Sequence, residues 1–385
     1  MEYRLVGRQM LRCLTALMVS MTFLASCGGS HSSSNTQASG ARDSLSYAEF
    51  FSIERLPDYT AVTVRNPWDS VRMLQKYILV KRDSVLPENL QQGIIVKVPL
   101  SNSLVLSTVH TSLLSELNAA ESIGGVCSAE YIKGDALVKR RKSGDLADCG
   151  DNMNPNIEKV IKLNPDAILL SPYENNDRYA RVADLGIPII ECADYMETSP
   201  LGRAEWVKFF GLLFGREDEA QKMFAETEKR YLDLKELAAP AKDKPKVLTD
   251  TQYGQTWGVP GANSTTGRYI EDAGGTNPFA KYNQTGSVQL APEKVLAEAH
   301  DADVWFIKYN QQTEKSLKEL SSDAPVNSRF KAFKDGNVFG CNTRYVNLFE
   351  ETPFHPDLML EEMIKVIHPE LFPDQPALRY YQQMK

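Results

Sequence analysis

Few residues of this sequence have the spacing of a known catalytic or metal site. It contains no G-x-S-x-G, no phosphate-binding G-x-x-x-x-G-K-[ST], no G-x-G-x-x-G and no H-E-x-x-H. Its histidines are His31, His110, His300, His355 and His368. No two of them could ligate a metal from one helix face, and no C-x-x-C is present. We therefore predict no metal centre, no cofactor and no enzymatic activity, although catalytic groups can converge from distant loops.

Polar and aromatic residues instead follow the predicted strands, where open α/β sheets bind their ligands. The candidate ligand-binding residues are Thr108, His110, Tyr173, Tyr195, Tyr253, Trp257, Tyr309, Arg344 and Tyr345. Aromatic faces with a few polar groups suit a bulky, ring-bearing ligand. Other roles remain open: each tyrosine could pack half-buried, His110 could make a local hydrogen bond, and Arg344 could pair with Glu350 or Glu351. Trp257 lies among glycines and prolines, which favours ligand contact.

The elements that must position these residues alternate between buried-type strands and helices. In the first part of the chain, strands are expected at 93–98, 104–108, 167–171 and 187–192, with helices near 110–119 and 157–163. The order returns with strands at 245–250 and 303–307 and helices at 265–273 and 292–299. Such alternation predicts a largely parallel sheet with helices on both faces.

One segment of this order is repeated almost literally. Glu158-Lys159-Val160-Ile161 precedes Asp166 at the same spacing at which Glu293-Lys294-Val295-Leu296 precedes Asp301, and a strand follows each aspartate. The repeat indicates two similar α/β lobes. Between them, residues 217–238 form an amphipathic helix with acids at its start and bases at its end, as the helix dipole favours. We expect this helix to be a stiff connection between the lobes.

The N-terminus has the features of an export signal. Three arginines precede a short apolar run at 13–25, which is too short to span a bilayer. Leu24-Ala25-Ser26-Cys27 resembles a bacterial lipobox, which implies cleavage before Cys27 and lipidation of that cysteine; a plain secretory signal is the alternative. Residues 28–43 are rich in Gly, Ser and Asn and are expected to form a flexible tether.

Composition narrows the remaining classes. The net charge of −7 has the wrong sign for a protein that binds nucleic acid.

Two β-rich runs at 59–65 and 77–82, separated by Asn66-Pro67, suggest a leading strand pair. An exported protein can form disulfides, and Cys127 with Cys149 is the favoured pair, while four buried free thiols are the alternative.

These motifs together resemble the substrate-binding proteins of ABC transporters for iron-siderophores, haem and cobalamin. LVLSTVHTSLLSEL, NIEKVIKLNPDAILL and SVQLAPEKVLAEAHDADVWFI carry the resemblance, which spans roughly residues 100–370. It implies two Rossmann-like lobes, each a mostly parallel sheet flanked by helices, joined by a single long helix with a ligand cleft between the lobes. The expected divisions are a signal peptide (1–26), a lipid-anchored tether (27–46), an N-terminal lobe with the leading strand pair (47–215), a bridging helix (216–239) and a C-terminal lobe (240–385).

The resemblance also implies partners. One surface glutamate on each lobe docks on the permease in this family, and the matching residues are Glu158 and Glu293; both also suit a first helical turn on dipole grounds alone. We expect a monomeric, extracytoplasmic receptor, lipid-anchored to a bacterial membrane, that serves an ABC permease and its ATPase. Ferric siderophore is the first choice of ligand, with cobalamin and haem close behind. Two rival hypotheses are an anchored hydrolase using His110 or Asp194 as base, and a structural or glycan-binding lipoprotein.

Overall fold

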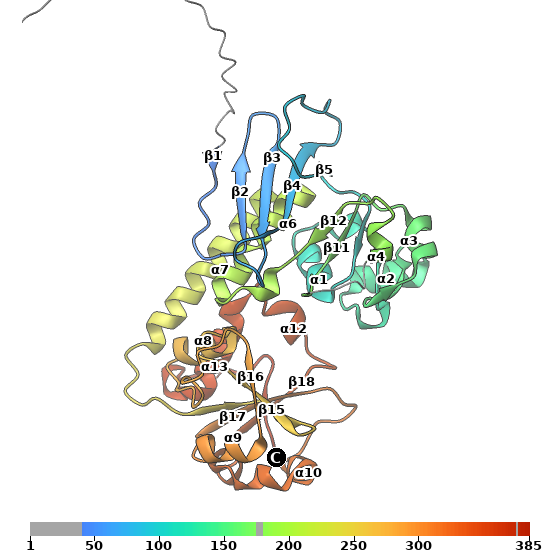
Figure 1. Cartoon of the computed structure of the whole chain (residues 1–385). Coiled ribbons are helices and arrows are strands. Elements are labelled where there is room, and N and C mark those ends of the chain that lie inside the picture. Colours follow the sequence, from blue (N-terminus) through green and yellow to red (C-terminus); the bar gives the residue numbers. More distant parts are fainter. Residues whose placement is uncertain (1–40, 175–179, 375) are drawn as a thin grey trace, which may run out of the picture. The chain divides into compact units, whose positions relative to one another are not determined.

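The computed structural model describes residues 41–174, 180–374 and 376–385 (Figure 1). The predicted signal peptide, the lipidation site Cys27 and most of the tether lie outside these residues. Within the described part of the chain, no helix combines the length and the apolar character needed to cross a membrane.

The N-terminal lobe is built on a five-stranded parallel sheet with the order β12-β11-β6-β7-β8. Its strands are β6 (Ser103–Val105), β7 (Ile123–Val126), β8 (Ala147–Asp148), β11 (Ala167–Leu170) and β12 (Ile189–Glu191). The helices of this region are α1 (Thr108–Glu116), α2 (Asp135–Ser143), α3 (Ile157–Leu163), α4 (Ala180–Ala183), α5 (Pro200–Glu205) and α6 (Val207–Phe214). Alternate residues of β6 and β11 enter different core clusters, so both faces of the sheet are buried, as the continuous apolar runs predict.

The C-terminal lobe repeats this plan with a four-stranded sheet in the order β13-β17-β18-β19. Its strands are β13 (Val247–Thr249), β17 (Val304–Tyr309), β18 (Val338–Asn342) and the antiparallel edge strand β19 (Gln382–Gln383). Its helices are α8 (Thr265–Asp272), α9 (Pro292–Ala299), α10 (Leu317–Asp323), α11 (Lys331–Lys334), α12 (Leu348–Glu351) and α13 (Pro356–Ile367). Along β17, Phe306 packs into one core cluster and Trp305 into another, so this sheet is also covered on both faces.

Two smaller sheets lie in the loops of the lobes. β14 (Gln252–Tyr253), β15 (Thr256–Pro260) and β16 (Ser287–Leu290) form an antiparallel sheet, and β9 (Gly150–Asp151) pairs with β10 (Asn154–Pro155). The fold class predicted from the sequence, parallel sheets flanked by helices in an α/β chain, is confirmed.

The long helix α7 spans Glu217–Ala238, the bounds expected from the sequence. It starts after Gly215, which adopts a left-handed conformation with φ of 63° and ends α6. Its buried stripe consists of Ala220, Phe224, Thr227, Tyr231, Leu234 and Ala238. Ala220 and Phe224 pack into the N-terminal core, whereas Tyr231, Leu234 and Ala238 pack into a C-terminal core. A single helix is therefore shared by both cores.

The expected leading strand pair is part of a larger sheet. β1 (Ala41–Arg42), β2 (Phe51–Arg55), β3 (Thr60–Arg65), β4 (Met73–Lys81) and β5 (Ile94–Val98) form one five-stranded sheet. β3 and β4 pair in antiparallel fashion as expected, whereas β5 runs parallel to β4 and belongs to this sheet rather than to the lobe sheet.

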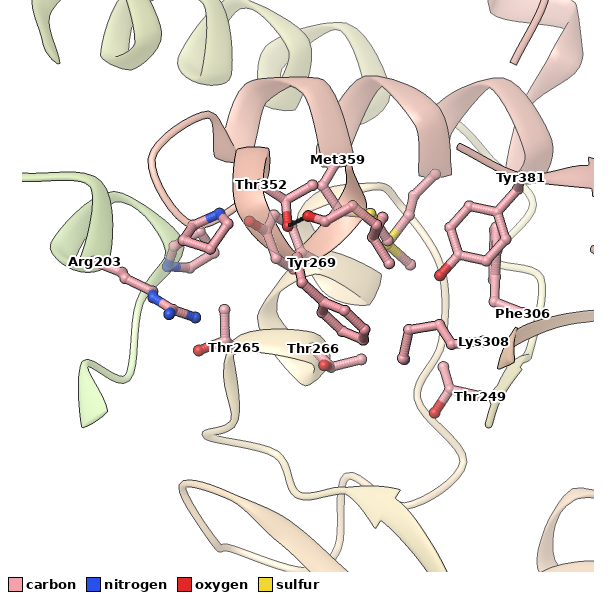
Figure 2. A pocket seen from close by; sticks show the side chains of 15 residues that line it. Arg203, Thr249, Thr265, Thr266, Tyr269, Phe306, Lys308, Thr352, Met359 and Tyr381 are labelled. Carbon is pink, nitrogen blue, oxygen red and sulfur yellow. Dashed lines mark hydrogen bonds between the residues drawn. The ribbon is translucent and has the colours of Figure 1, made fainter. Parts of the chain in front are cut away.

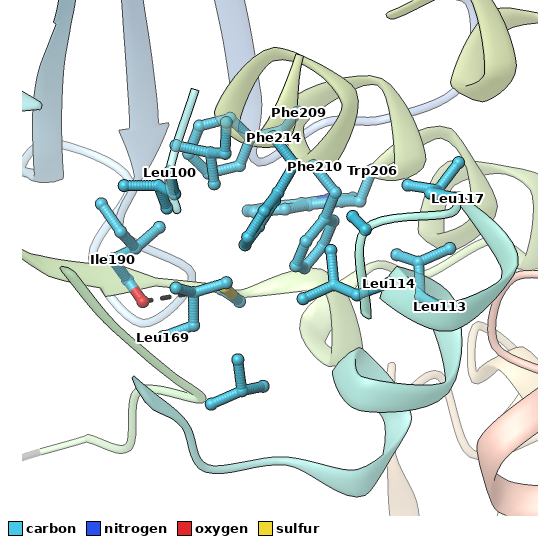
Figure 3. Packing of buried hydrophobic residues seen from close by; sticks show 14 of the residues in the cluster. Leu100, Leu113, Leu114, Leu117, Leu169, Ile190, Trp206, Phe209, Phe210 and Phe214 are labelled. Carbon is cyan, nitrogen blue, oxygen red and sulfur yellow. Dashed lines mark hydrogen bonds between the residues drawn. The ribbon is translucent and has the colours of Figure 1, made fainter. Parts of the chain in front are cut away.

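This N-terminal sheet shares a core with the lobe that follows it. The rings of Phe51 and Trp206 lie 4.7 Å apart, and those of Tyr77 and Phe209 lie 5.9 Å apart. Figure 3 shows the aromatic side chains of α6 packed with Leu113 and Leu114 of α1 and with Leu169 of β11. Because Phe209 of α6 and Trp206 directly before it make these contacts, the sheet is an integral part of this core.

Candidate functional site

The candidate site lies at the carboxyl ends of the parallel strands, where the expected ligand residues were placed. In the N-terminal lobe, a pocket of about 200 Å³ is lined by Leu106, Ser107, Thr108, Tyr131, Asn152, Ser171 and Tyr173. Most of these residues follow β6, β7 or β11, and Asn152 lies in the turn between β9 and β10. The structure therefore brings Thr108 and Tyr173, two of the predicted residues, to one pocket.

Tyr195 supports this pocket from the neighbouring strand. It follows β12, its ring centroid lies 6.2 Å from that of Tyr173, and its hydroxyl donates a hydrogen bond to the carbonyl of Pro172. Burial raises the pKa of the Tyr195 phenol to about 12, and Tyr173 and Asp194 add to this effect. Tyr195 is therefore a neutral donor at physiological pH, and it fixes the loop that carries Tyr173.

Exposed aromatic rings occur only at this set of strand ends within the described residues. The aromatic side chains left exposed there are Tyr131, Tyr173, Tyr253, Tyr345 and Phe349. Tyr131 follows β7, Tyr173 follows β11, Tyr253 follows β13, and the last two follow β18. Of these rings, Tyr131 and Tyr173 line the same pocket, so both are available to a ligand that enters it.

Lys133 connects the strand ends of the two sheets. Its ammonium donates to the carbonyl oxygens of Thr343 at 3.2 Å and Val346 at 3.0 Å, and it lies 3.4 Å from Glu350. Lys133 follows Tyr131 by two residues, while the carbonyls it binds flank Tyr345. The exposed rings after β7 and after β18 thus belong to segments that contact each other.

Polar groups of the C-terminal lobe lie beside these rings. The Tyr309 hydroxyl donates to Glu314 at 2.5 Å, and the Tyr345 hydroxyl donates to the carbonyl of Gln312 at 2.7 Å. Arg344 is exposed and makes no ion pair with any described residue. Glu350 and Glu351, its alternative partners, are taken by Lys133 and Arg379. Arg344 is therefore a positive charge available to a ligand.

Trp257 is not placed for ligand contact, and this corrects the expectation from its glycine-rich surroundings. Its side chain is fully buried, stacks on Trp305 at 5.7 Å and donates from Nε1 to the carbonyl of Thr249 at 3.0 Å. The pairing of β15 with β14 and β16 turns this segment into a strand whose inner face carries the tryptophan. Trp257 is a core residue.

His110 is also buried, so it cannot touch a ligand in this structure. Its Nε2 lies 2.9 Å from Oδ1 of Asp194, which is itself buried and accepts a second hydrogen bond from Nε of Arg203 at 3.1 Å. Burial by itself raises the pKa of Asp194, but the charges of His110 and Arg203 hold that pKa below its usual range. The two residues considered as a catalytic base are thus engaged with each other and are closed to substrate.

The four cysteines of the described chain are free and buried. The favoured Cys127–Cys149 disulfide is therefore not formed in this structure, and the alternative of four buried thiols holds. Cys127 and Cys149 do share a small apolar core cluster. Burial raises the pKa of the Cys127 thiol to about 12 and that of Cys149 to about 11, so neither is a reactive thiolate at neutral pH.

Metal ligands do not gather anywhere in the described part of the chain. No group of three or more His, Cys, Asp or Glu side chains is placed to hold an ion there. What the site offers instead is a set of aromatic rings, hydroxyls and one unpaired guanidinium.

Tyr131 was not predicted from the sequence because a 3₁₀ turn separates it from its strand. The only signal in the sequence was a tyrosine in an otherwise polar loop.

The fold and the strand-end site are those of a solute-binding protein. The family model for periplasmic binding proteins matches residues 105–345, and the chain belongs to that family. The N-terminal sheet, β1 to β5, precedes the matched region.

Three known proteins illustrate the relationship. An uncharacterized lipoprotein of Methanocaldococcus jannaschii is 31% identical over 313 residues, which cover 77% of this chain and 73% of that protein. A cobalamin-binding protein of Halobacterium salinarum is 28% identical over 201 residues, 51% of this chain and 53% of that protein. The crystal structure of a possible iron-binding, periplasmic solute-binding protein from Staphylococcus epidermidis superposes with a TM-score of 0.56 at 17% identity, covering 70% of this chain and 99% of that one.

Proposed function

We propose that this protein is the receptor of an ABC importer and that it captures a ring-bearing metal chelate. The carrying observation is the set of exposed rings at the strand ends of both lobes: Tyr131, Tyr173, Tyr253, Tyr345 and Phe349. A flat or ring-bearing ligand would cover these rings, and such contacts add specific geometry to apolar burial. Ferric siderophores are the first choice, and cobalamin and haem are the other candidates.

The charge at the site favours an anionic group on the ligand. Arg344 is exposed and unpaired among the described residues, and a guanidinium binds carboxylate or catecholate oxygens through a planar, two-pronged contact. The tyrosine hydroxyls beside it supply neutral hydrogen-bonding groups. The names of two relatives, a cobalamin-binding protein and a possible iron-binding protein, support the same ligand classes.

The remaining parts of the proposal concern the lipid anchor, the division into lobes and the delivery of the ligand. Cleavage before Cys27 and its lipidation would anchor the protein outside the cytoplasm, and a relative is named as a lipoprotein. We assign residues 47–215 and 240–385 to the two lobes and 216–239 to the bridge. The protein is proposed to act as a monomer and to deliver its ligand to a permease and its ATPase through Glu158 and Glu293.

The proposal is tested by isothermal calorimetry of the full-length chain with ferric siderophores, cobalamin and haem. Calorimetry is preferable to tryptophan fluorescence because Trp206, Trp257 and Trp305 are fully buried. Saturable 1:1 binding with the ligand recovered unchanged is expected. Failure of all three classes to bind would overturn the ligand assignment, and chemical conversion of the ligand would favour the hydrolase instead.

Variants connect the binding to the site. Tyr253→Ala and Tyr345→Ala each remove an exposed ring, and each is expected to weaken binding by about five- to thirtyfold, or about 1–2 kcal/mol. Leu232→Ala is the matched control, because Leu232 is an exposed apolar residue on α7 and should leave the affinity unchanged. Equal affinities for all three variants would place the ligand elsewhere.

A further inference from the structure

A histidine and a glutamate join the two lobes at one point beside the long helix α7. His355 directly precedes α13 of the C-terminal lobe, and its Nε2 lies 2.5 Å from Oε2 of Glu116, the last residue of α1 in the N-terminal lobe. The two residues are 239 positions apart in the sequence, so the contact depends on how the lobes are arranged. Helix α12, which comes just before His355, also packs against α1.

This contact lies away from the strand ends that carry the candidate ligand site. α1 begins at Thr108, beside that site, and ends at Glu116, about 12 Å further along the helix axis. Glu116 and His355 line a cavity of about 370 Å³, together with residues of α7. Figure 2 shows a different pocket, between Arg203 of α5 and the strand ends of the C-terminal lobe, with Met359 of α13 on its wall. The two cavities share no lining residue, so the contact is not part of that pocket.

The helices around His355 present several charged groups to it. α1 contributes Glu116, α12 contributes Glu351 and α13 contributes Asp357. The charged groups of α7 that line the same cavity are Glu219, Lys222, Glu226 and Arg230. Glu351 pairs with Arg379 at 2.8 Å, and Asp357 lies 3.5 Å from the guanidinium on α7. Glu116 makes no other ion pair among the described residues, so it is the carboxylate that is free to answer a proton on His355.

The proton on His355 decides how strong the contact is. Burial by itself would lower the pKa of His355, but the hydrogen bond and the charge of Glu116, with smaller effects of Asp357 and Glu351, raise that pKa above its usual value of 6.5. The protonated ring forms a charge-assisted bond that is roughly twice as strong as the neutral bond left after deprotonation. Because the folded-state pKa is raised, this added strength is complete below the unfolded-state value and is lost as pH rises through the folded-state value.

We propose that His355 and Glu116 form a proton-dependent latch between the two lobes. With the proton bound, the ion pair holds α1 against the corner between α12 and α13; without the proton, the lobes part more readily at this point. A proton binds more tightly to the latched arrangement than to one that separates the two side chains, so it favours the latched arrangement. A faster release of ligand at higher pH would follow, and only this consequence rests on the proposed function.

Proton NMR of the histidine rings in the full-length chain tests the electrostatic part of the proposal. The resonance that disappears in His355→Gln assigns the ring. His355 should titrate above pH 6.5 in the wild type and about 0.5–1 pH unit lower in Glu116→Gln. Glu121→Gln is the matched control, because Glu121 is an exposed glutamate of the same lobe, and it should leave the titration unchanged. The same titration in wild type and Glu116→Gln would overturn the proposal.

Hydrogen exchange tests whether the proton holds the helices together. Amides 117–119, at the end of α1, and amides 354, 355 and 358, at the corner between α12 and α13, are in backbone hydrogen bonds. Mass spectrometry at pH 6 and pH 8.5, with exchange times scaled for the intrinsic rate, should show several-fold weaker protection of both segments at the higher pH. In His355→Gln, which keeps a neutral hydrogen-bonding group, protection should be the same at the two pH values and close to that of wild type at pH 8.5.

His300→Gln is the control for this experiment, because His300 is an exposed histidine, and it should keep the pH dependence of the wild type. Protection that does not depend on pH in the wild type would refute the latch, even if His355→Gln lowers protection, because the contact would then be merely structural. A pH dependence that persists in His355→Gln would refute it as well, since another group would then be responsible.

The consequence for the ligand is measured separately. For a chelate that binds, stopped-flow displacement should give a dissociation rate several-fold higher at pH 8.5 than at pH 6 in the wild type, and equal rates in His355→Gln. A ratio that persists in the variant would contradict the link between latch and release. Because the NMR and exchange experiments use no ligand, failure of every chelate to bind would overturn only the ligand assignment, and pH-independent exchange would overturn only the latch.

Discussion

Nε2 of His110 lies 2.9 Å from Oδ1 of Asp194, and both side chains are buried. The pair joins α1 to the segment after β12, and Arg203 of α5 binds the other carboxylate oxygen. Nδ1 of His110 has no partner in the structure. The carboxylate therefore serves three elements at once, and its removal would leave a buried imidazole and a half-buried guanidinium without their acceptor.

We expect Asp194→Ala to lower the free energy of unfolding by about 3–5 kcal/mol, the usual cost of removing one member of a buried charge pair. Urea unfolding at pH 7 measures this loss. Asp233→Ala, at an exposed aspartate paired with Lys229, is the control and should cost less than about 1 kcal/mol. A loss as small as that of the control would show that the buried pair contributes nothing.

The same pair gives a pH dependence with a definite sign. The pKa of Asp194 is depressed in the folded protein, so its contribution to stability is present above the unfolded-state value of about 3.9 and is lost as pH falls through the folded-state value. The difference in stability between wild type and Asp194→Ala should therefore narrow as pH falls below about 4. A difference that stays the same or widens below about pH 4 would contradict this sign.

Several elements were predicted with their observed bounds because local signals decide them. α3, α7 and α9 begin and end where the sequence indicated: the Asn156 side chain accepts from the amide of Lys159, and Pro292 occupies the first turn of α9. The failures concern burial. Trp257 was expected at the ligand because of its glycine-rich surroundings and His110 because it follows a strand end, whereas long-range packing against Trp305 and Phe210 buries them.

Glu191 should make the protein less stable as pH rises. Burial raises its pKa to about 7, against a smaller opposing effect of a hydrogen bond from Gln75. Between the unfolded-state value of about 4.3 and pH 7, the folded protein holds a proton that the unfolded chain releases, so stability falls as pH rises through this window. Glu191→Gln mimics the neutral form and should raise the free energy of unfolding at pH 8 by about 1–3 kcal/mol, and by less at pH 5.

Urea unfolding of wild type and Glu191→Gln at the two pH values checks this prediction. Glu236→Gln, on the exposed face of α7, is the matched control and should behave like wild type at both. A stabilisation by Glu191→Gln that is equal at pH 5 and pH 8 would mean that the effect does not come from titration of this group.

Two buried glutamates hold the segment that leads into the N-terminal sheet. Glu205 accepts hydrogen bonds from the backbone amides of residues 46, 47 and 48, and Glu197 accepts from those of residues 49 and 50. Glu205 is completely buried and also pairs with Lys208 at 2.7 Å. Each carboxylate thus replaces the strand partners that this stretch of backbone lacks.

Glu205→Gln should release this segment, because the amide group turns a donor toward backbone N–H donors. We expect a loss of about 1–3 kcal/mol in unfolding free energy and faster hydrogen exchange of amides 46–48, while those of β3 stay protected. Hydrogen-exchange mass spectrometry resolves the two regions. Unchanged exchange over 46–48 would show that β2 pairing alone fixes the segment, and Glu217→Gln, at an exposed glutamate, controls for loss of surface charge.

Glu158 and Glu293 occupy equivalent first-turn positions of α3 and α9, and both are exposed. If they dock on basic residues of a permease, Glu158→Lys with Glu293→Lys should abolish most of the uptake while leaving the affinity for the ligand unchanged, because neither lies among the ring-bearing strand ends. Charge reversal at a two-point contact places like charges opposite each other and slows association most strongly at low salt. Glu236→Lys on α7 changes the net charge by the same amount per site and should leave uptake intact. The measurement is transport of the chelate into proteoliposomes that contain the permease and its ATPase, at two salt concentrations. If the double reversal leaves uptake unchanged, the docking surface is not on these helices. If Glu236→Lys lowers uptake as well, the effect comes from the overall charge of the protein.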